Sequence, residues 1–448
     1  MFIDFLTDRF TESPEADAIV WRDRVNTFAW LLERLDHWRR TLDAHDVGAG
    51  TVVVLESDYS ADAVALFLVL IERGCILVPL TDFTEPKRSG YVRTAQGERI
   101  VRLDAGGGFS VTELPGPADH PHYQQLRIDG HPGLVLFSSG STGESKAAVH
   151  DFAKLLVKFH RRRHNLRTLA FMLFDHIGGI DTLLYSLSNG SCVITVVDRS
   201  PDSVCRAVEK YGVQVLPVTP TFLNLLLLSE VYKKYDLSSL VYITYGTEVM
   251  PEETLKRCAT LFPDVTLLQK YGTTEVGTLR SKSRSSDSLW MKIGGEGYQT
   301  RIVDGQLQIK AASAMLGYLN APSPFTEDGW FITGDEVIQD GEFLRILGRQ
   351  SEVINVGGEK VYPAEVENVI QQMPEIADVV VYGERNPLVG NIVCARVKPA
   401  QPGDPKTIAL LVKRHCRRHL ENFKVPVKVH VSTEDQHSPR FKKMRRGL

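Results

Sequence analysis

The sequence lacks closely spaced cysteines. Its six cysteines lie far apart along 448 residues, and no Cys-x-x-Cys pair occurs. This distribution argues against a zinc site and against a disulfide scaffold, and it favours a reducing compartment. We therefore expect a cytoplasmic protein.

Long apolar runs and an excess of charge are also missing. The longest apolar run, from Ala63 to Ile71, is too short to span a bilayer. Asp4 comes early and no basic segment precedes it, so the first residues do not resemble a signal peptide. The formal net charge is −3, so no overall field draws the protein to nucleic acid or a membrane surface. We expect no nucleic-acid partner and no membrane span.

What is present is the composition of an ordinary globular protein, 43% hydrophobic and 24% charged. Short apolar runs alternate with helical patterns over most of the chain. The expected strands cover residues 51–55, 75–79, 133–137, 169–173, 192–197, 213–217, 240–244 and 265–268. This alternation predicts an α/β fold with mostly parallel sheets covered by helices, which bind ligands at the carboxyl ends of the strands.

The pattern changes twice in the last third of the chain. From about residue 292 to 347, short alternating segments with Asp-Gly at 304–305 and 340–341 predict hairpins and a small β subdomain. The remainder predicts a compact α+β unit of about 100 residues, a normal domain size. We expect an N-terminal domain over 1–347, a hinge at 348–351 and a mobile C-terminal domain over 352–448.

The most informative segment, residues 136–146, is a strand end followed by Ser, Thr and Gly and then Lys146. Hydroxyls and backbone N–H groups on such a loop suit a polyphosphate, and lysine adds a positive charge. The spacing is not that of a P-loop, because Gly140, Gly143 and Lys146 lie three apart and Ala147 follows. Alone, the segment fits a flexible linker equally well.

Four further segments resolve that ambiguity. They are Tyr-Gly-Thr-Thr-Glu at 271–275, Gly-Trp-Phe-Ile-Thr-Gly-Asp at 329–335, the stretch 348–361, and Lys442-Lys443. In this order and spacing, together with the serine loop, they resemble the adenylate-forming superfamily. That family includes acyl- and aryl-CoA synthetases, peptide-synthetase adenylation domains and firefly luciferase. The resemblance covers nearly the whole chain.

The resemblance implies an ATP- and Mg²⁺-dependent ligase. Such an enzyme converts a carboxylic acid to an acyl-adenylate, releases pyrophosphate, and passes the acyl group to a thiol, here with coenzyme A as the expected acceptor. The alternative acceptors are a carrier-protein phosphopantetheine or an amine. An alternative of another class is a noncatalytic nucleotide-binding relative. The aromatic and apolar residues expected near the acid favour an aromatic or medium-length acid.

The resemblance also assigns residues to the nucleotide. Glu275 matches the Mg²⁺-associated glutamate, and Thr274 a phosphate-contacting hydroxyl. Asp335 matches the aspartate that binds the ribose hydroxyls, and Arg349 a nearby arginine. The other matching positions are Ser138, Ser139, Gly140, Ser141, Thr142, Gly143 and Lys146 at the phosphates, Gly246, Thr247 and Glu248 at the adenine, and the run Tyr271, Gly272 and Thr273. The adenine segment departs from the usual Gly-Gly-Ala-Pro, because Tyr245 replaces the first glycine and Glu248 the proline.

At the C-terminus the resemblance is weaker. The family ends in Gly-Lys-Ile/Val-x-Arg, and this chain lacks the glycine. Residues 443–446 fit Lys-Ile-x-Arg, so Lys443 is the expected catalytic lysine and Lys442 the fallback. His176 matches a histidine beside the acyl pocket, and Ser351 the hinge. The sequence also leaves open the ordinary explanations: a solvated glutamate, a turn aspartate, a buried histidine and a basic tail.

Overall fold

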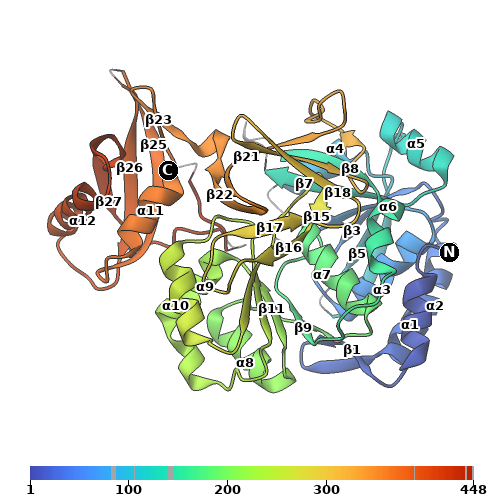
Figure 1. Cartoon of the computed structure of the whole chain (residues 1–448). Helices are drawn as coiled ribbons and strands as arrows, with labels where there is room; N and C mark the ends of the chain where they lie inside the picture. The colour runs from blue at the N-terminus through green and yellow to red at the C-terminus, as the bar shows by residue number, and fades with distance from the viewer. Residues whose placement is uncertain (82–86, 105, 140–144, 388, 439–440, 446–448) are drawn as a thin grey trace.

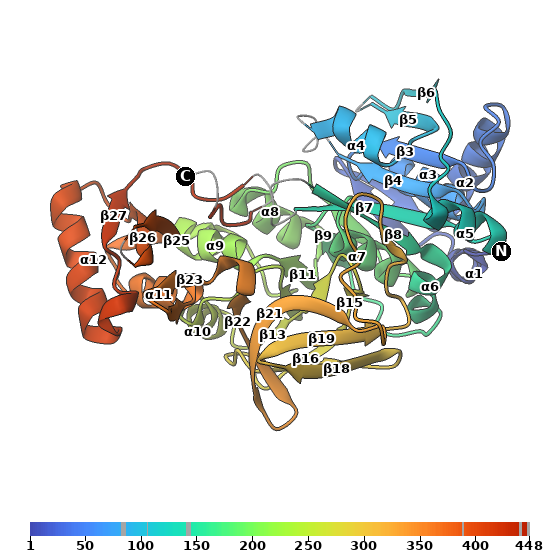
Figure 2. The same ribbon diagram turned by 90° about the horizontal axis from the view of Figure 1, so that it is seen from above.

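A computed structural model describes residues 1–81, 87–104, 106–139, 145–387, 389–438 and 441–445 (Figure 1). Two seven-stranded sheets and a six-stranded sheet form the larger part of the molecule, and a smaller domain follows. Figure 2 shows the small C-terminal domain at the end of the molecule opposite to the N-terminus.

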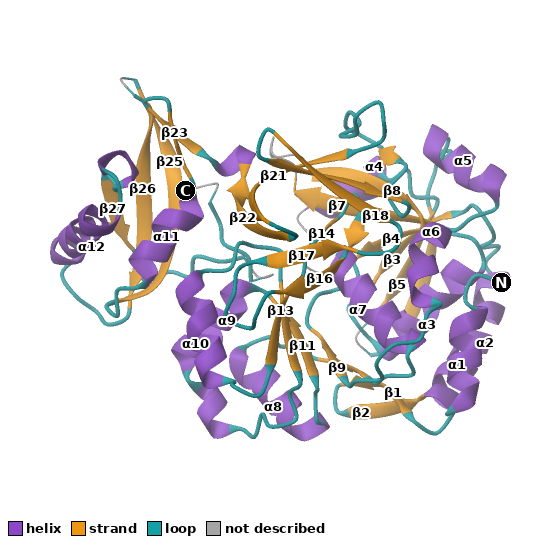
Figure 3. Ribbon diagram, viewed as in Figure 1, coloured by secondary structure: helices purple, strands orange, loops and turns teal. Residues whose placement is uncertain are grey.

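The first sheet has the order β13-β12-β11-β9-β10-β1-β2, and its neighbours pair in parallel except β1 with β2. Helices flank its strands in Figure 3. The strands are β1 (Asp17–Trp21), β2 (Arg24–Thr27), β9 (Thr168–Ala170), β10 (Val193–Thr195), β11 (Val215–Val218), β12 (Tyr242–Tyr245) and β13 (Thr266–Gln269). The helices of this part are α7 (Ile177–Ser188), α8 (Pro201–Tyr211), α9 (Pro220–Ser229) and α10 (Glu252–Leu261).

The second sheet has the order β20-β8-β7-β4-β3-β5-β6. Its central strands β7, β4, β3 and β5 run in parallel, whereas β6, β8 and β20 pair antiparallel at the edges. The strands are β3 (Val52–Glu56), β4 (Ile76–Leu80), β5 (Arg99–Leu103), β6 (Phe109–Glu113), β7 (Gly133–Ser139), β8 (Ser145–Asp151) and β20 (Gly317–Tyr318). The accompanying helices are α1 (Asp4–Glu12), α2 (Phe28–Asp43), α3 (Ala61–Glu72), α4 (Arg88–Thr94), α5 (Pro121–Asp129) and α6 (Phe152–Leu156).

The apolar helix α3 connects these two layers. Ten of its residues are buried, on every side of the helix. A helix that is apolar all round is stable only inside a core. It lies in one apolar cluster with Ile19 of β1, Leu55 of β3 and Leu183 of α7, so both sheets share this core.

The third sheet is antiparallel and has the order β16-β17-β22-β21-β19-β18. Asp304 and Gly305 both have positive φ, 50° and 77°, which suits a two-residue hairpin turn. The sheet begins at Arg280, before the expected start near residue 292. Its strands are β16 (Arg280–Ser283), β17 (Met291–Gly294), β18 (Tyr298–Val303), β19 (Gln306–Ala311), β21 (Phe331–Asp340) and β22 (Phe343–Arg349); β14 (Gly272–Thr273) and β15 (Gly277–Thr278) form a separate short pair.

The C-terminal domain has its own core, in which Val366, Val379 and Val412 are fully buried. A short 3₁₀ turn, Gln350–Glu352, joins it to β22. Its elements are β23 (Ile354–Val356), β24 (Glu359–Val361), α11 (Pro363–Gln371), β25 (Ile376–Asn386), β26 (Gly390–Pro399), α12 (Pro405–His419) and β27 (Lys428–Val431). The predicted α/β fold with a small α+β domain is thus confirmed. No helix among the described residues combines the length and the apolar character needed to cross a membrane.

Candidate active site

Three predicted nucleotide residues meet at the edge of the third sheet. Tyr271 donates its hydroxyl proton to Asp335 Oδ2 at 2.5 Å, and Arg349 Nε donates to Asp335 Oδ1 at 3.2 Å. The register of β21 with β22 places Asp335 opposite Arg349. Asp335 is only 6% exposed, and this burial raises the pKa of its carboxyl although Arg349 acts in the opposite direction. The result is a held carboxylate whose two oxygens can accept from neighbouring hydroxyls.

A second group joins the phosphate-loop lysine to Glu275 through Tyr318. The Tyr318 hydroxyl donates to Glu275 Oε1 at 2.7 Å, and Lys146 Nζ lies 5.2 Å from the centroid of the Tyr318 ring. The Asn320 side chain binds the main chain of β8 on both sides of Lys146. It accepts from Ala147 N–H and donates to Ser145 O, both at 2.9 Å. Sequence reasoning missed Tyr318 and Asn320, which carry no charge and no loop signature.

His150 is a further residue that the sequence did not reveal. Its ring is fully buried on β8, and its Nε2 lies 2.7 Å from Thr274 O. Burial lowers the pKa of this imidazole to about 4, so the ring is neutral near pH 7 and donates from Nε2 to the carbonyl. The contact links the strand after the phosphate loop to Thr274 and Glu275.

The donor set around Glu275 fits a magnesium ion that arrives with a nucleotide. Glu275 is 9% exposed, and Thr274 adds a hydroxyl beside it in the chain. No group of three or more His, Cys, Asp or Glu suited to a metal occurs among the described residues. Mg²⁺ commonly binds through one or two carboxylates together with phosphate oxygens, so this sparse set suits it better than a dedicated protein cage would.

The strands on either side of the expected phosphate loop pair antiparallel. Strand β7 pairs with β8 so that Ser138 lies opposite Lys146, and Ser139 opposite Ser145. This differs from a P-loop, whose strand leads into a helix. Gly140, Ser141, Thr142 and Gly143 lie outside the described residues.

The segment expected near adenine follows β12, and the run that begins at Tyr271, also expected to bind the nucleotide, follows β13. Gly246 and Gly272 allow close backbone approach, because an added Cβ would lie 2.7 Å from Lys270 O and 2.8 Å from Gly277 O, respectively. Thr247 has a φ of 72°, and Thr273 is buried. The Glu248 carboxylate accepts from the Thr221 hydroxyl at 2.7 Å and from Lys443 N–H at 2.6 Å. The sequence did not predict these Glu248 contacts.

His176 begins helix α7 and faces the C-terminal tail. Its Nδ1 accepts from Gly178 N–H at 3.1 Å, so the neutral ring carries its proton on Nε2. Lys442 Nζ lies 3.4 Å from that Nε2. The Lys442 ammonium and the His176 Nε2–H group, which come from different domains, therefore lie next to each other.

Lys443, the lysine expected to be catalytic, points the other way. Its ammonium lies 3.1 Å from Glu367 Oε2 and 2.9 Å from Val379 O, and its side chain is only 9% exposed. In this pose the Lys443 ammonium is bound by groups of the C-terminal domain. The contacts of Lys442 with His176 favour the fallback over Lys443 as the lysine of the site.

Comparisons with known proteins agree with this arrangement. A family model described as AMP-binding enzyme matches residues 96–319, half of the chain, and one described as AMP-binding enzyme C-terminal domain matches residues 365–442. The indoleacetate–CoA ligase of Aromatoleum aromaticum is 29% identical over an alignment of 296 positions that covers 60% of this chain and 58% of that protein. The 2-succinylbenzoate–CoA ligase of Bacillus cytotoxicus is 25% identical over an alignment of 480 positions that covers 99% of this chain and 98% of that protein.

Solved structures have the same fold. A crystal structure of an anthranilate CoA ligase in complex with anthranoyl-AMP gives a TM-score of 0.83 at 19% identity, covering 99% of this chain and 95% of that one. An amide bond synthetase from Marinactinospora thermotolerans gives 0.77 at 20% identity, covering 97% and 96%. With its two matching family models and its fold, the chain belongs to the AMP-binding enzymes of the adenylate-forming superfamily.

Proposed function

We propose that the protein is an AMP-forming acid–thiol ligase that activates a carboxylic acid with ATP and then transfers the acyl group to coenzyme A. Family membership supports the adenylation step. The names of relatives that match this chain, among them indoleacetate–CoA ligase and 2-succinylbenzoate–CoA ligase, support coenzyme A as the acceptor.

The meeting of Lys442 with His176 carries the proposal. In the first half-reaction a carboxylate attacks the α-phosphorus, and pyrophosphate leaves. Both reactants are anions, so the enzyme must neutralise charge where they meet. Lys442 Nζ and His176 Nε2, 3.4 Å apart, supply two donors at one point, one of them cationic. A carboxylate oxygen that lies to one side of this pair and accepts from both nitrogens would be held and partly neutralised.

The backbone supports Lys442 as the family's lysine. In the family a glycine precedes this lysine, and here Phe441 does. Phe441 has a φ of 54°, in the left-handed region that favours glycine. Phe441 thus has the backbone conformation expected of the family's glycine, and the residue after it is Lys442. This assignment agrees with the contact of Lys442 with His176.

The remaining residues bind the nucleotide in this proposal. Asp335, held by Tyr271 and Arg349, accepts from the ribose hydroxyls. Lys146 and the serine loop hold the phosphates. Glu275 and the phosphate oxygens would hold Mg²⁺, which supplies positive charge to the triphosphate.

We further propose that the acid is aromatic. Phe171 and Phe222 pack edge to face with ring centroids 4.7 Å apart, and the tail places Phe441 against both, at 5.3 and 5.7 Å. Phe171 and Phe222 are 3% and 0% exposed, so they form part of the core on which Phe441 docks, next to Lys442 in the chain. The names of two relatives, indoleacetate–CoA ligase and 2-succinylbenzoate–CoA ligase, specify aromatic acids and support the proposal.

One assay tests the proposal. Pyrophosphate release is measured over a panel of aromatic and aliphatic acids, with and without coenzyme A, and thioester formation is followed in parallel. We expect acid-dependent pyrophosphate release and an acyl-CoA product. If pyrophosphate is released but the acyl group is transferred only to a carrier protein or an amine, the assignment of coenzyme A as the acceptor is wrong. No acid-dependent release over the whole panel would contradict the ligase.

A further inference from the structure

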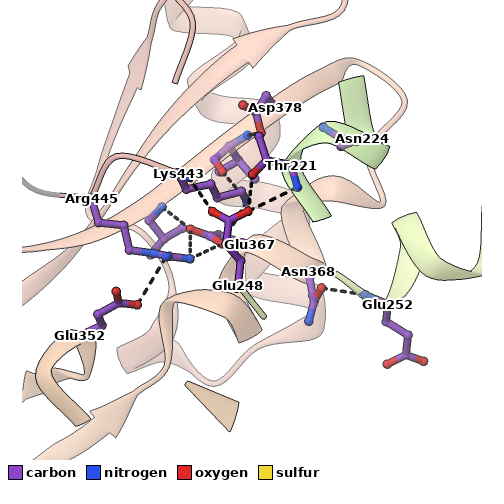
Figure 4. Close-up of polar contacts among 12 residues, drawn as sticks. Thr221, Asn224, Glu248, Glu252, Glu352, Glu367, Asn368, Asp378, Lys443 and Arg445 are labelled. Carbon is purple, nitrogen blue, oxygen red and sulfur yellow. Dashed lines mark hydrogen bonds and ion pairs between the residues drawn. The ribbon is translucent and has the colours of Figure 1, made fainter. Parts of the chain in front are cut away.

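The C-terminal tail, residues 441–445, is held between two carboxylates, one from each domain (Figure 4). Glu367 lies on α11 of the C-terminal domain, and Glu248 follows β12 of the N-terminal domain. Both carboxylates contact Lys443, the residue next to Lys442.

The Glu367 carboxylate binds two side chains of the tail. It is 3% exposed and accepts from Lys443 Nζ at 3.1 Å, from Arg445 Nη2 at 2.9 Å and from Val381 N–H at 3.0 Å. Burial raises the pKa of the Glu367 carboxyl, but Arg445 and Lys443 together bring it below its usual value. Glu367 therefore stays ionised and fastens the tail to its own domain.

The Glu248 carboxylate binds the main chain of the tail instead. Its Oε1 accepts from Lys443 N–H at 2.6 Å, and its Oε2 accepts from the Thr221 hydroxyl at 2.7 Å. On the other side of Lys442, the Thr219 hydroxyl donates to Phe441 O at 2.8 Å. The N-terminal domain thus holds the main-chain groups on both sides of Lys442.

This arrangement fixes the direction of Lys442. Lys443 forms a β-bridge with His437, and successive side chains of extended backbone point to opposite sides. With Lys443 turned into the C-terminal domain, Lys442 is turned toward His176. Residue 248 is where the family's usual segment has proline, which has no side-chain acceptor.

We propose that Glu248 is a positioning residue that aligns Lys442 for adenylation by accepting the Lys443 N–H across the domain interface. Glu248 and Lys443 belong to different domains, so the bond exists only while the C-terminal domain is in this pose. It must break before the domain moves for thioester formation. The role in catalysis rests on the proposed function, whereas the contact itself does not.

Substitution of Glu248 tests the proposal, with Asn368 as a matched control. The Asn368 side chain accepts from Glu252 N–H at 3.1 Å, so it also bridges the domains, but it does not touch the tail. Glu248→Ala should lower acid-dependent ATP–pyrophosphate exchange by about 10- to 100-fold, the scale expected for a misplaced catalytic group. Thioester formation at saturating presynthesised acyl-adenylate should fall far less than the exchange, because that step does not use this pose and saturation removes any change in adenine affinity.

The conservative variant separates positioning from folding. Glu248→Gln keeps a carbonyl oxygen for Lys443 N–H and should restore most of the exchange activity, whereas Asn368→Ala should leave both half-reactions close to wild type. Equal loss of both half-reactions in Glu248→Ala, or no rescue by Glu248→Gln, would overturn the positioning role.

Amide hydrogen exchange gives a readout that needs no activity. In the protein without substrates, Glu248→Ala should speed exchange of the peptide containing residues 441–445, and Asn368→Ala should not. Unchanged exchange in Glu248→Ala would show that the contact does not hold the tail. If amide exchange is faster in Glu248→Ala but the wild-type protein adenylates no acid, the Glu248 contact is supported and the proposed function is contradicted.

Discussion

At the residue scale, two adjacent lysines have opposite environments. Lys443 Nζ contacts a nearly buried glutamate and a main-chain carbonyl, whereas Lys442 Nζ contacts the ring of a histidine in the other domain. The Lys443 ammonium forms a buried ion pair, whereas the Lys442 ammonium lies at the boundary between the domains, where we propose that it acts on a substrate carboxylate. The pair therefore offers a direct experimental contrast.

We predict that Lys442→Ala lowers the single-turnover rate of pyrophosphate release by about 10²–10³, as expected for loss of one charged donor at the transition state. Thioester formation from supplied acyl-adenylate should be retained. Lys443→Ala should have the smaller effect on adenylation, because Arg445 still neutralises Glu367. The reverse order, with Lys443→Ala the more damaging, would return the assignment to Lys443.

Removal of the metal should stop the reaction. Glu275 together with nucleotide phosphates would form a hard oxygen site, so we predict that EDTA abolishes pyrophosphate release, that Mg²⁺ or Mn²⁺ restores it, and that zinc-selective chelators have no effect. Glu275→Gln should raise the Mg²⁺ concentration needed for half-maximal rate, and Glu296→Gln, on an exposed turn, serves as the control. Full turnover in EDTA would contradict the metal assignment.

At the element scale, the site depends on how strands and helices are fastened to one another. Strand β20 brings Tyr318 to Glu275 and pairs with β8, which carries His150 to Thr274. Helix α11 holds the tail through Glu367. These links join elements that lie far apart in the sequence, so each can be weakened without touching a reacting group.

The tail should loosen in acid. The pKa of Glu367 is lowered in the folded protein, so its carboxylate contributes stability fully above its usual pKa of about 4.5 and loses it as the pH falls toward the lower folded value. Glu367→Gln leaves two cations without their partner and should cost about 3 kcal/mol near pH 7. The difference in unfolding free energy between wild type and variant should shrink as the pH falls below about 4.5.

Denaturant unfolding at pH 7, 5 and 4 checks this prediction. Glu365→Gln is the control, because Glu365 is a half-exposed partner of Lys424 on the same helix and should contribute about 1 kcal/mol or less. A difference for Glu367→Gln that does not change with pH would mean that the carboxylate charge is not what holds the tail.

At the scale of the whole molecule, one site must serve two reactions. Lys442 reaches the site from the C-terminal domain, and a short 3₁₀ turn over Gln350–Glu352 connects that domain to β22. Arg445 also lies 3.4 Å from Glu352 in this turn, so the tail contacts the connection itself. We propose that the C-terminal domain moves about Ser351 between the half-reactions and brings the Gly357-Gly358 turn to the site.

Proline at the hinge should separate the two reactions. Proline fixes φ near −65° and restricts the residue before it, so we predict that Ser351→Pro impairs one half-reaction far more than the other, with thioester formation the more affected. The measurement pairs single-turnover pyrophosphate release with thioester formation from presynthesised acyl-adenylate. Equal loss would indicate a misfolded connection, and no loss in either would contradict domain movement.

The fold class and the family can be predicted from the amino-acid sequence alone. Strand and helix periods, the Asp-Gly turns and the spacing of the five motifs are local signals, and they survive without knowledge of the tertiary structure. The sequence does not predict hairpin strand β8, which begins at Ser145 inside the motif that resembles a phosphate loop.

By contrast, the packing of distant elements sets which lysine lies against His176 and what Glu248, Tyr318 and His150 contact. Lys442 and Lys443 are neighbours with the same side chain, so composition and spacing cannot separate them. Their difference arises because one lies against the N-terminal domain and the other against Glu367, and those surroundings come from elements far away in the chain. A side chain's partner depends on which elements pack around it, and no local pattern records that packing.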